Sequence, residues 1–254
     1  LISDNNITNK LEGNIEFENV TVYYSESEIT ALDNVSFSIK SGENIGIIGT
    51  TGSGKSTIAS AILRLFDCTK GDVLIDGENI KNLNVNHLRN SIGYVPQDVF
   101  LFSDTIHENI AFGKNNATKD EVIQASKDAG VYENIIGFPK QFETLVGERG
   151  ITLSGGQKQR ISIARATIKQ PEILIFDDCL SAVDTKTEDE ILTNLKRIMK
   201  NKTSIIIAHR ISSVQWTDKI LVTDNGKIIE QGTHNELLAQ KGNYFDLFQK
   251  QSVN

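Results

Sequence analysis

The sequence predicts an α/β fold with a parallel sheet at its core, antiparallel strands at its start and a helical segment inserted between two groups of strands. Three observations support this prediction. The 254 residues are 39% hydrophobic and 23% charged, which is the composition of a packed domain. Short apolar runs of strand length occur in the first third and, alternating with helical segments, in the last third. A polar, more helical stretch from about Asp98 to Gln170 separates these regions.

The first strands are predicted between residues 15 and 39, where apolar and polar residues alternate with a period of two, as in Val35-Ser36-Phe37-Ser38-Ile39. We therefore expect antiparallel sheet at the start. The continuous apolar run 44–49 predicts a buried strand, and helical spacing over residues 58–66 predicts a helix. Glycines fill the segment between them, so the expected order is strand, glycine loop, helix. A further strand and turn are expected over residues 73–77.

The last third alternates strands with helices, which is typical of a parallel α/β sheet. Strands are expected over residues 173–176 and 204–208, with a helix over about 187–199 between them. Asp224-Asn225-Gly226-Lys227 lies between two apolar runs and predicts a hairpin with a type I′ turn. Capping boxes at helix starts are predicted for Thr118 with Glu121 and for Thr233 with Glu236.

Charge and cysteine content disfavour several classes of protein. The chain has 26 basic and 33 acidic side chains and a net charge of -7, which argues against broad binding of nucleic acid. Cys68 and Cys179 have no partner at metal spacing, so neither a disulfide framework nor a zinc site is predicted, and a reducing compartment is expected. No apolar run approaches the roughly 18 residues needed to cross a bilayer. Because the chain begins at Leu1 without a signal-peptide pattern, we expect a fragment of a longer protein.

A phosphate-binding loop is predicted between the buried strand and the following helix. Residues 49–56 match G-x-x-x-x-G-K-[ST] in the strand-to-helix context that this motif requires. Glycines let backbone N–H groups face phosphate oxygens, and the helix N-terminus favours an anion. Lys55 is expected to reach the β and γ phosphates and Ser56 to bind Mg²⁺, with Thr57 near the α-phosphate. The predicted nucleotide-binding residues of the loop are Gly49, Thr50, Thr51, Gly52, Ser53, Gly54, Lys55, Ser56 and Thr57.

A second functional segment is the apolar strand over residues 173–176, which ends in the carboxylates Asp177 and Asp178. Parallel α/β sheets place their ligands at the carboxyl ends of strands. Apolar strands ending in aspartate are also common as turns and helix caps, so this signal becomes strong only beside a phosphate loop. In that context Asp177 is expected to anchor Mg²⁺, either directly or from behind its ligands.

Between these segments lies Leu153-Ser154-Gly155-Gly156-Gln157, which ordinary kinases and small GTPases do not require. With it the chain resembles the ABC ATPase family over about residues 13–251. Six motifs follow the family's order: the phosphate loop, Gln97 in Tyr94-Val95-Pro96-Gln97, the LSGGQ signature, the Asp177 strand, Ser181-Ala182-Val183-Asp184, and His209. Residues 101–106 and 146–150 look like those of exporter-type members.

The resemblance implies a P-loop NTPase fold, with a RecA-like parallel sheet core, an N-terminal antiparallel β subdomain and an inserted α-helical subdomain at about residues 98–170. Residues 1–12 would be the linker from a missing transmembrane domain, and residues 13–251 the ATP-binding domain. The implied ligands are ATP and Mg²⁺. The implied partners are a transmembrane domain of the same or an associated chain and a second ABC ATP-binding domain, with no nucleic acid. The implied place is the cytoplasmic face of the cell membrane, with the fragment itself soluble.

The resemblance also assigns roles outside the phosphate loop. Ser154 and Gln157 have capping-box spacing, and the signature would close in trans on the γ-phosphate held by a second domain, with residues 181–184 across the same interface. Tyr24 would stack on adenine, although Tyr23 beside it offers another register. The implied metal-binding residues are Ser56, Gln97 and Asp177. The implied catalytic residues are Asp178 as general base, His209 at the γ-phosphate and Gln97 at the metal and water.

The sequence departs from the family at Asp178, because efficient ATPases of the family usually carry glutamate there. The base is one methylene short, and a misplacement of about 1 Å can lower a rate by ~10²-fold. One reading is an ATP-hydrolysing motor domain with a slow site of its own. The alternative is a regulatory, essentially non-hydrolytic subunit of a heterodimeric exporter, whereas an adequate Asp178 would suit a homodimer. The acidic charge disfavours a soluble member acting on DNA or ribosomes.

Overall fold

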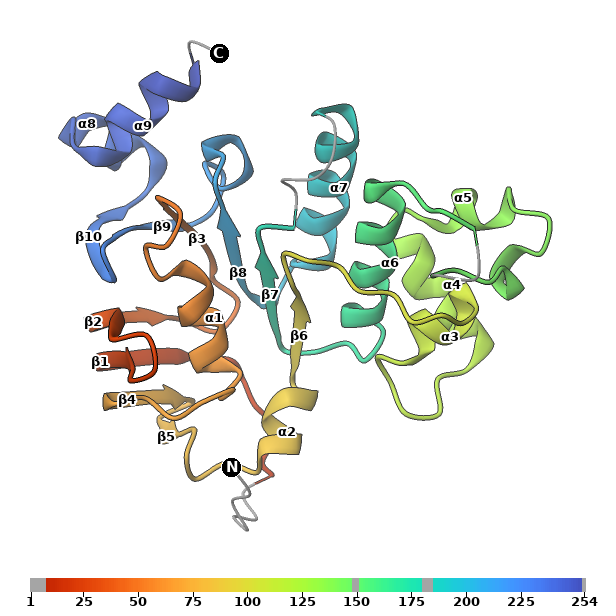
Figure 1. The fold of residues 1–254 in the computed structure, drawn as a ribbon, viewed down its shortest axis with the longest axis horizontal. Helices are drawn as coiled ribbons and strands as arrows, with labels where there is room; N and C mark the ends of the chain where they lie inside the picture. Colours follow the sequence, from red (N-terminus) through yellow and green to blue (C-terminus); the bar gives the residue numbers. More distant parts are fainter. Residues whose placement is uncertain (1–7, 148–150, 180–184, 253–254) are drawn as a thin grey trace. The chain divides into compact units, whose positions relative to one another are not determined.

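The computed structural model describes residues 8–147, 151–179 and 185–252, with the side chains of residues 185–187 left out (Figure 1). The chain divides into two compact units, and each is described by itself. Within the described residues, unit 1 comprises residues 8–92, 172–178 and 201–252. Unit 2 comprises residues 93–147, 151–171, 179 and 185–200.

Unit 1 contains most of the strands. They are β1 (Ile15–Tyr24), β2 (Ile29–Ile39), β3 (Asn44–Gly49), β4 (Lys70–Ile75), β5 (Glu78–Asn79), β7 (Ile173–Asp177), β8 (Thr203–Ala208), β9 (Lys219–Asp224) and β10 (Lys227–Gly232), while β6 (Ile92–Val95) begins at the last residue before unit 2. The helices are α1 (Lys55–Ile62), α2 (Val85–Asn90), the 3₁₀ turn η2 (Ile211–Ser213), α8 (His234–Gln240) and α9 (Asn243–Ser252).

The strands form two sheets, as the sequence predicts. The first is a four-stranded antiparallel sheet in the order β2-β1-β4-β5, built from the early part of the chain. The second is a six-stranded sheet in the order β10-β9-β3-β8-β7-β6, in which β9, β3, β8 and β7 are parallel neighbours. Ile47 of β3 lies opposite Ile207 on one side and Leu221 on the other. Strand β3 is therefore central, and the chain leaves its carboxyl end directly into the glycine loop.

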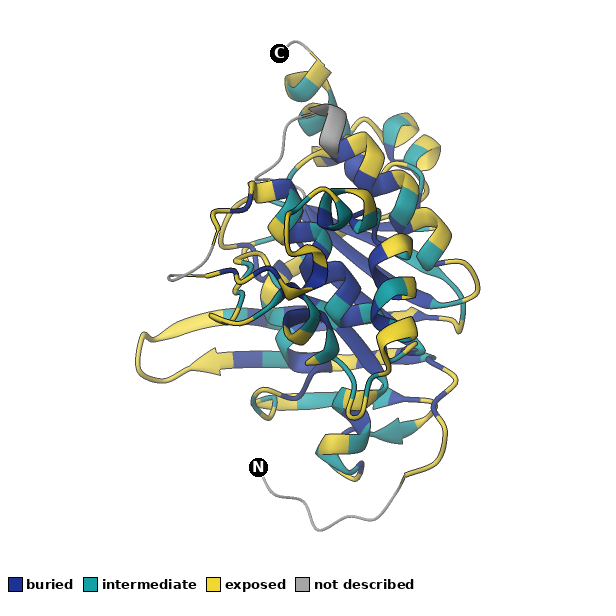
Figure 2. Cartoon of the chain, turned by 90° about the vertical axis from the view of Figure 1, so that its right-hand side faces the viewer, coloured by how far each residue is buried: buried dark blue, intermediate teal, exposed yellow. Residues whose placement is uncertain are grey.

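Burial follows the two kinds of sheet. Every residue of β7 and β8 is buried, because a parallel sheet covered on both faces needs continuous apolar strands. Figure 2 shows buried residues in dark blue, including strands in the interior. Strand β1 instead mixes buried and exposed positions, as the period of two predicts for a half-buried strand.

The turn and the helix caps predicted from neighbouring residues are confirmed. Asn225 and Gly226 have φ of 46° and 76°, and the strand ends Asp224 and Lys227 pair directly, which makes the predicted type I′ hairpin. Both predicted capping boxes form. The helix expected over residues 58–66 is wrong at both ends, because α1 starts on the loop at Lys55 and ends before Arg64, whose φ is 47°.

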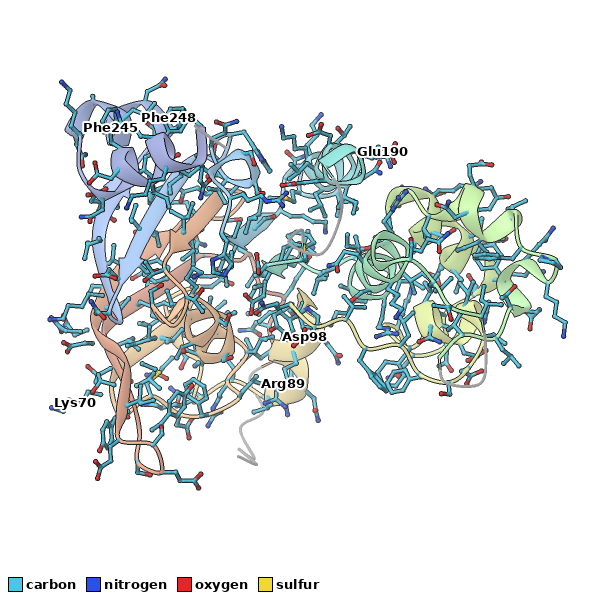
Figure 3. The ribbon with its side chains drawn as sticks, turned by 45° about the horizontal axis from the view of Figure 1, so that its top comes forward. Lys70, Arg89, Asp98, Glu190, Phe245 and Phe248 are labelled. Atoms are coloured by element: carbon cyan, nitrogen blue, oxygen red, sulfur yellow. The ribbon has the colours of Figure 1, made fainter. Side chains whose placement is uncertain are left out.

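The C-terminal helices of unit 1 are anchored at the start of α9. The Tyr244 backbone N–H donates to Glu230 Oε2 at 2.9 Å, and the Tyr244 ring is fully buried. Its hydroxyl lies 2.7 Å from His234 Nδ1, and His234 also packs against Phe248, with ring centroids 5.7 Å apart. Figure 3 labels Phe245 and Phe248 on this helix. Helix α9 is therefore fixed at its first turn and along one side.

Unit 2 is helical. Its elements are α3 (Ile106–Ala111), α4 (Lys119–Asp128), α5 (Tyr132–Ile136), the 3₁₀ turn η1 (Gln141–Glu143), α6 (Gly155–Thr167) and α7 (Thr185–Ile198). Helix α6 contacts α3, α4 and α7. The unit contains the described part of residues 98–170, for which a helical subdomain is predicted, and also α7, which packs against α6.

The last residues before position 13 make contacts with unit 1. Leu11 is buried, and the Glu12 backbone N–H donates to Asp76 Oδ2 at 2.7 Å, so the end of the predicted linker packs on unit 1. Among the described helices, none combines the length and the apolar character that crossing a membrane requires.

Candidate functional site

The glycine loop joins β3 to α1 in a conformation that depends on its glycines. Gly52 and Gly54 have φ of 79° and 95°, which other residues rarely adopt. A Cβ on Gly49 would lie 2.2 Å from the backbone oxygen of Thr223, so glycine permits the close approach to β9. The start of α1 has neither a side-chain cap nor an acidic residue in its first turn. The helix therefore presents the positive end of its dipole to the loop, which favours an anion there.

The β9–β10 hairpin supports this loop. The hydroxyls of Ser53 and Thr223 are 2.8 Å apart, and the Gly226 backbone N–H donates to the Ser53 backbone oxygen at 3.2 Å. Thr50 Oγ1 donates to Asp224 Oδ1 at 3.3 Å. Sequence reasoning located the hairpin but not this role, because the contacts join residues about 170 positions apart.

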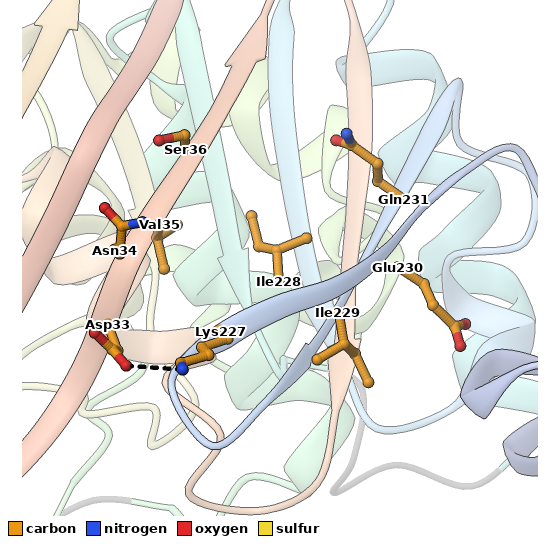
Figure 4. Close-up of a pocket in the computed structure, with 9 residues that line it drawn as sticks. All are labelled: Asp33, Asn34, Val35, Ser36, Lys227, Ile228, Ile229, Glu230 and Gln231. Carbon is orange, nitrogen blue, oxygen red and sulfur yellow. Dashed lines mark ion pairs between the residues drawn. The ribbon is translucent and has the colours of Figure 1, made fainter.

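The same hairpin also touches β2. The Asp33 backbone N–H donates to the Gly226 backbone oxygen at 2.9 Å, and Lys227 Nζ pairs with Asp33 Oδ2 at 3.0 Å (Figure 4). A cavity of about 650 Å³ opens between β2 and β10 beyond this pair. None of the predicted site residues lines the cavity, so we assign it no part in the site.

Lys55 lies folded over its own loop. Its Nζ donates to the backbone oxygens of Gly49 at 2.9 Å and Thr50 at 2.8 Å, and only 6% of the residue is exposed. Burial lowers the pKa of the Lys55 amine below its usual range, and the charges of Asp178 and Asp177 oppose this shift. A bound anion would add to that opposition, because a nearby negative charge favours the ammonium. The position is therefore suited to phosphate.

Ser56 and Asp177 join the loop to the end of β7. Ser56 Oγ donates to Asp177 Oδ1 at 2.9 Å, and Asp177 is buried. A hydroxyl and a carboxylate are hard oxygen ligands of the kind that Mg²⁺ takes, together with water and substrate phosphates. In the described part of the chain, no group of three or more His, Cys, Asp or Glu side chains is placed to hold a metal. The residues fit a Mg²⁺ ion that is held mainly by nucleotide and water, as Mg²⁺ commonly is.

Asp178 and His209 face each other at the ends of β7 and β8. Asp178 Oδ2 lies 3.7 Å from His209 Nε2, which is longer than a direct hydrogen bond. Asp178 is buried and has φ of 44°, and its backbone N–H donates to the Ile207 oxygen at 2.8 Å. Such left-handed positions in non-glycine residues concentrate at functional sites. The carboxylate and the imidazole therefore lie close together, beside the Ser56–Asp177 contact.

Sequence reasoning missed Gln251, whose side chain holds the loop that follows β8. Its Nε2 donates to the His209 backbone oxygen at 2.7 Å, and its Oε1 accepts the Ile211 backbone N–H at 2.8 Å. Gln251 lies at the end of α9, and no local pattern in the sequence marks a contact with a residue 42 positions earlier.

Tyr24 and Tyr23 lie on opposite faces of β1, because neighbouring strand residues alternate. Tyr24 makes an edge contact with Phe66, with ring centroids 5.7 Å apart, and is partly exposed. The Tyr23 backbone N–H instead donates to Thr69 Oγ1 at 3.0 Å.

The remaining predicted residues belong to unit 2. Ser154 caps α6, with Gln157 N–H donating to Ser154 Oγ at 3.2 Å and Ser154 N–H donating to Gln157 Oε1 at 3.0 Å, so this predicted capping box forms. Gly155 is exposed, Gly156 is buried, and the first turn has no acidic residue. Gln97 is exposed in a bend after β6. Residues 148–150 and the predicted interface segment 181–184 lie outside the described residues.

The geometry therefore brings together the phosphate loop, Asp177, Asp178 and His209 within unit 1. It places Tyr24 in the same unit, whereas Gln97 and the signature are described within unit 2 alone. A glycine loop open to an anion, the oxygen atoms of Ser56 and Asp177, and the neighbouring Asp178 and His209 side chains therefore lie together in this unit.

Known proteins resemble this chain over nearly its full length. The putative multidrug export ATP-binding/permease protein YgaD of Bacillus subtilis is 46% identical over 245 residues, which are 96% of this chain and 42% of that protein. The ABC transporter B family member 24, mitochondrial, of Arabidopsis thaliana is 46% identical over 99% of this chain and 38% of its own length. A solved structure of a bacterial Atm1-family ABC exporter with ATP bound has a TM-score of 0.92 and 41% identity, covering 98% of this chain and 43% of that one.

The chain thus spans about two fifths of the length of the relatives it matches. The family model described as ABC transporter matches residues 32–181, which is more than half of the chain. Because this family model matches more than half of the chain, and the fold is that of a solved ABC exporter structure, the chain belongs to the ABC transporter family.

Proposed function

We propose that this chain is the ATP-binding and ATP-hydrolysing motor domain of an exporter and that its own site turns over slowly. The observation that carries the proposal is the convergence of three features: Lys55, the Ser56–Asp177 contact and the Asp178–His209 pair. They lie at the carboxyl ends of the neighbouring parallel strands β3, β8 and β7. The names of the relatives, which combine export, ATP binding and a permease, support the same function.

In the proposed reaction the loop N–H groups and Lys55 bind the phosphates, and Ser56 and Asp177 would hold Mg²⁺. Mg²⁺ would neutralise charge on the β and γ oxygens during phosphoryl transfer. Water attacks the γ-phosphorus, the bond to the β–γ bridging oxygen breaks, and Asp178 accepts the water's proton. We expect His209, whose Nε2 lies 3.7 Å from Asp178 Oδ2, to contact the γ-phosphate. Because Asp178 is one methylene shorter than glutamate, its carboxylate stands farther from that water, which lowers the rate.

The signature supports a second domain as a partner. Ser154 and Gln157 close their capping box on each other, and the exposed Gly155 leaves the start of α6 open to a phosphate. We propose that it closes on the γ-phosphate held by another ABC domain, in a head-to-tail dimer that reopens after hydrolysis. The shortened base favours a different chain as that partner. A regulatory subunit that holds ATP while the partner hydrolyses it is the alternative reading of the same residue.

An aromatic cluster in unit 2 supports a transmembrane domain as the other partner. Phe100 and Phe112 are 66% and 69% exposed, and both pack against Phe102, with centroids 5.2 Å and 4.6 Å away. Exposed apolar clusters of this kind mark protein contacts. We propose that a transmembrane domain, in this or an associated chain, docks on this cluster at the cytoplasmic face of the membrane.

Complementation between two inactive variants tests the dimeric site. Lys55→Ala disables the phosphate loop but keeps the signature, whereas Gly155→Asp keeps the loop and puts a carboxylate where the partner's phosphate would bind. An acidic residue in the first turn favours the helix itself, so α6 should remain folded. We expect little Mg²⁺-dependent ATP turnover from either variant alone and clear turnover from their mixture.

The complementation is measured in the natural and the Asp178→Glu backgrounds, at several protein concentrations. A mixture no more active than its components would contradict a site shared between two domains. Failure of the natural chain to bind ATP with Mg²⁺ in calorimetry would overturn the proposed function itself.

Tyr24 provides a prediction about nucleotide affinity. We expect Tyr24→Ala to raise the dissociation constant for ATP about fivefold, because base–aromatic stacking contributes roughly 1 kcal/mol or more. Tyr23→Ala is the matched control and should change it little. Inorganic tripolyphosphate, which lacks the base, should bind equally to all three chains. A loss of affinity in Tyr23→Ala instead would assign the adenine contact to the other face of β1.

A further inference from the structure

One side chain of α9 holds the segment that carries His209 by two hydrogen bonds. Gln251 Nε2 donates to the His209 backbone oxygen at 2.7 Å, and Gln251 Oε1 accepts the Ile211 backbone N–H at 2.8 Å. An amide donates and accepts at the same time, so a single glutamine can close on a carbonyl and an N–H of the same loop. The pair of bonds spans the turn between the end of β8 and η2.

Other contacts hold helix α9 in place. Its first turn is bonded to Glu230, and Tyr244 is buried against His234, as described above. Near its other end, Gln251 and Phe248 line a cavity of about 380 Å³ together with Arg210 and Ile211 of the loop. The Gln251 amide is thus a direct link between α9 and the loop from β8 to η2.

We propose that Gln251 is a positioning residue for His209, which its two hydrogen bonds hold at the distance from Asp178 that the reaction needs. This inference rests on the proposed function of the site. The imidazole of His209 is partly exposed, and its Nε2 lies 3.7 Å from Asp178 Oδ2, so local packing does not enclose it. Fixing the backbone carbonyl of the same residue restricts where the ring can lie. Gln251 makes no described contact with the phosphate loop, so its effect falls on turnover and not on ATP affinity.

Two substitutions distinguish the hydrogen bond that Gln251 donates from the one that it accepts. Gln251→Ala removes both hydrogen bonds. Gln251→Glu keeps an acceptor for the Ile211 N–H but sets a carboxylate against the His209 carbonyl oxygen. Gln249→Ala is the matched control, because Gln249 is the same residue type, lies exposed on the same helix and makes none of these contacts. We expect kcat to fall about tenfold in both Gln251 variants with KM for ATP changed by less than about twofold, and no change in Gln249→Ala.

Histidine NMR measures the same effect without ATP. The chain has four histidines, and His234 packs against Tyr244 and Phe248, so its signal reports whether α9 stays docked. We expect the His209 imidazole signal to shift or broaden in both Gln251 variants while those of His87, His107 and His234 stay in place.

The outcomes are distinct. An unchanged His209 signal or an unchanged kcat in both Gln251 variants overturns the proposal. A shift of His234 together with His209 in Gln251→Ala, with normal kcat in Gln251→Glu, also overturns it, because the residue would then act only in holding α9. If the natural chain binds and hydrolyses no ATP, the proposed function fails, and the His209 signal still decides whether Gln251 positions the ring.

Discussion

Replacing Asp178 with glutamate is expected to raise Mg²⁺-dependent ATP turnover by as much as about 10²-fold. The added methylene carries the carboxylate toward the water that attacks the γ-phosphate, and a shift of about 1 Å in a catalytic group changes rates on this scale. The surroundings of Asp178 otherwise suit a base, because it is buried beside His209 and its charge acts on the pKa of Lys55.

The same substitution is expected to lower stability slightly. Asp178 has φ of 44°, a left-handed conformation that aspartate tolerates better than longer side chains because its short carboxylate bonds locally. Glutamate should therefore reduce the free energy of unfolding by up to about 1 kcal/mol. Activity and stability then move in opposite directions, so a rise in turnover cannot come from better folding.

Two further variants test whether the rise in turnover is specific to a glutamate at position 178. Asp177→Glu adds the same methylene to the neighbouring carboxylate and should lower turnover, because Asp177 Oδ1 already accepts from Ser56 Oγ at 2.9 Å in a buried position. Asp178→Asn removes the base and should lower turnover as well. Single-turnover assays at high protein concentration measure all four chains.

The turnover of Asp178→Glu decides whether the natural site mainly holds ATP or hydrolyses it efficiently. A large rise in Asp178→Glu means that the natural chain is built to hold ATP, and a partner with its own base performs most of the hydrolysis. Equal and substantial rates mean that Asp178 is an adequate base and that a homodimer is the simpler assembly. Lower turnover in Asp178→Glu than in the natural chain would contradict the role of position 178 as the base.

Features governed by local rules could be predicted from the sequence. The type I′ turn at Asn225 and Gly226 and the three capping boxes depend on residues within four positions of one another, and all four form. The glycine loop lies between β3 and α1 because its motif fixes both flanking elements. The parallel core follows from apolar strands alternating with helices.

Contacts between distant segments could not be predicted in this way. The Gln251 bonds to the His209 loop and the Ser53–Thr223 contact join residues far apart in the chain, and nothing in either local sequence marks them. The packing of α7 against α6 within unit 2 is a contact of the same kind. Asp178 is intermediate: its departure from the family is visible in the sequence, whereas its left-handed backbone is visible only in the structure.

The junction of α3 and α6 depends on a close approach at Gly113, which no sequence motif indicates. A Cβ on Gly113 would lie 1.8 Å from the Arg165 backbone oxygen and 2.8 Å from Ile168 Cγ2. The Arg165 side chain bonds across the same junction, donating to the Asn109 backbone oxygen at 2.7 Å and to the Phe100 backbone oxygen at 2.8 Å. Burial lowers the pKa of this guanidinium, which still carries its charge near neutrality and so strengthens both bonds.

Gly113→Ala is therefore expected to reduce the free energy of unfolding by about 3 kcal/mol. The added methyl group meets backbone, which cannot rotate away, so the end of α3 must move from α6 and stretch the Arg165 bonds. Gly137→Ala is the matched control in unit 2, because its φ is -68° and the nearest atoms to an added Cβ are 3.4 Å and 3.5 Å away. Urea unfolding should leave Gly137→Ala within about 0.5 kcal/mol of the natural chain. If the midpoint of urea unfolding were the same for Gly113→Ala and Gly137→Ala, α3 and α6 would not approach each other so closely.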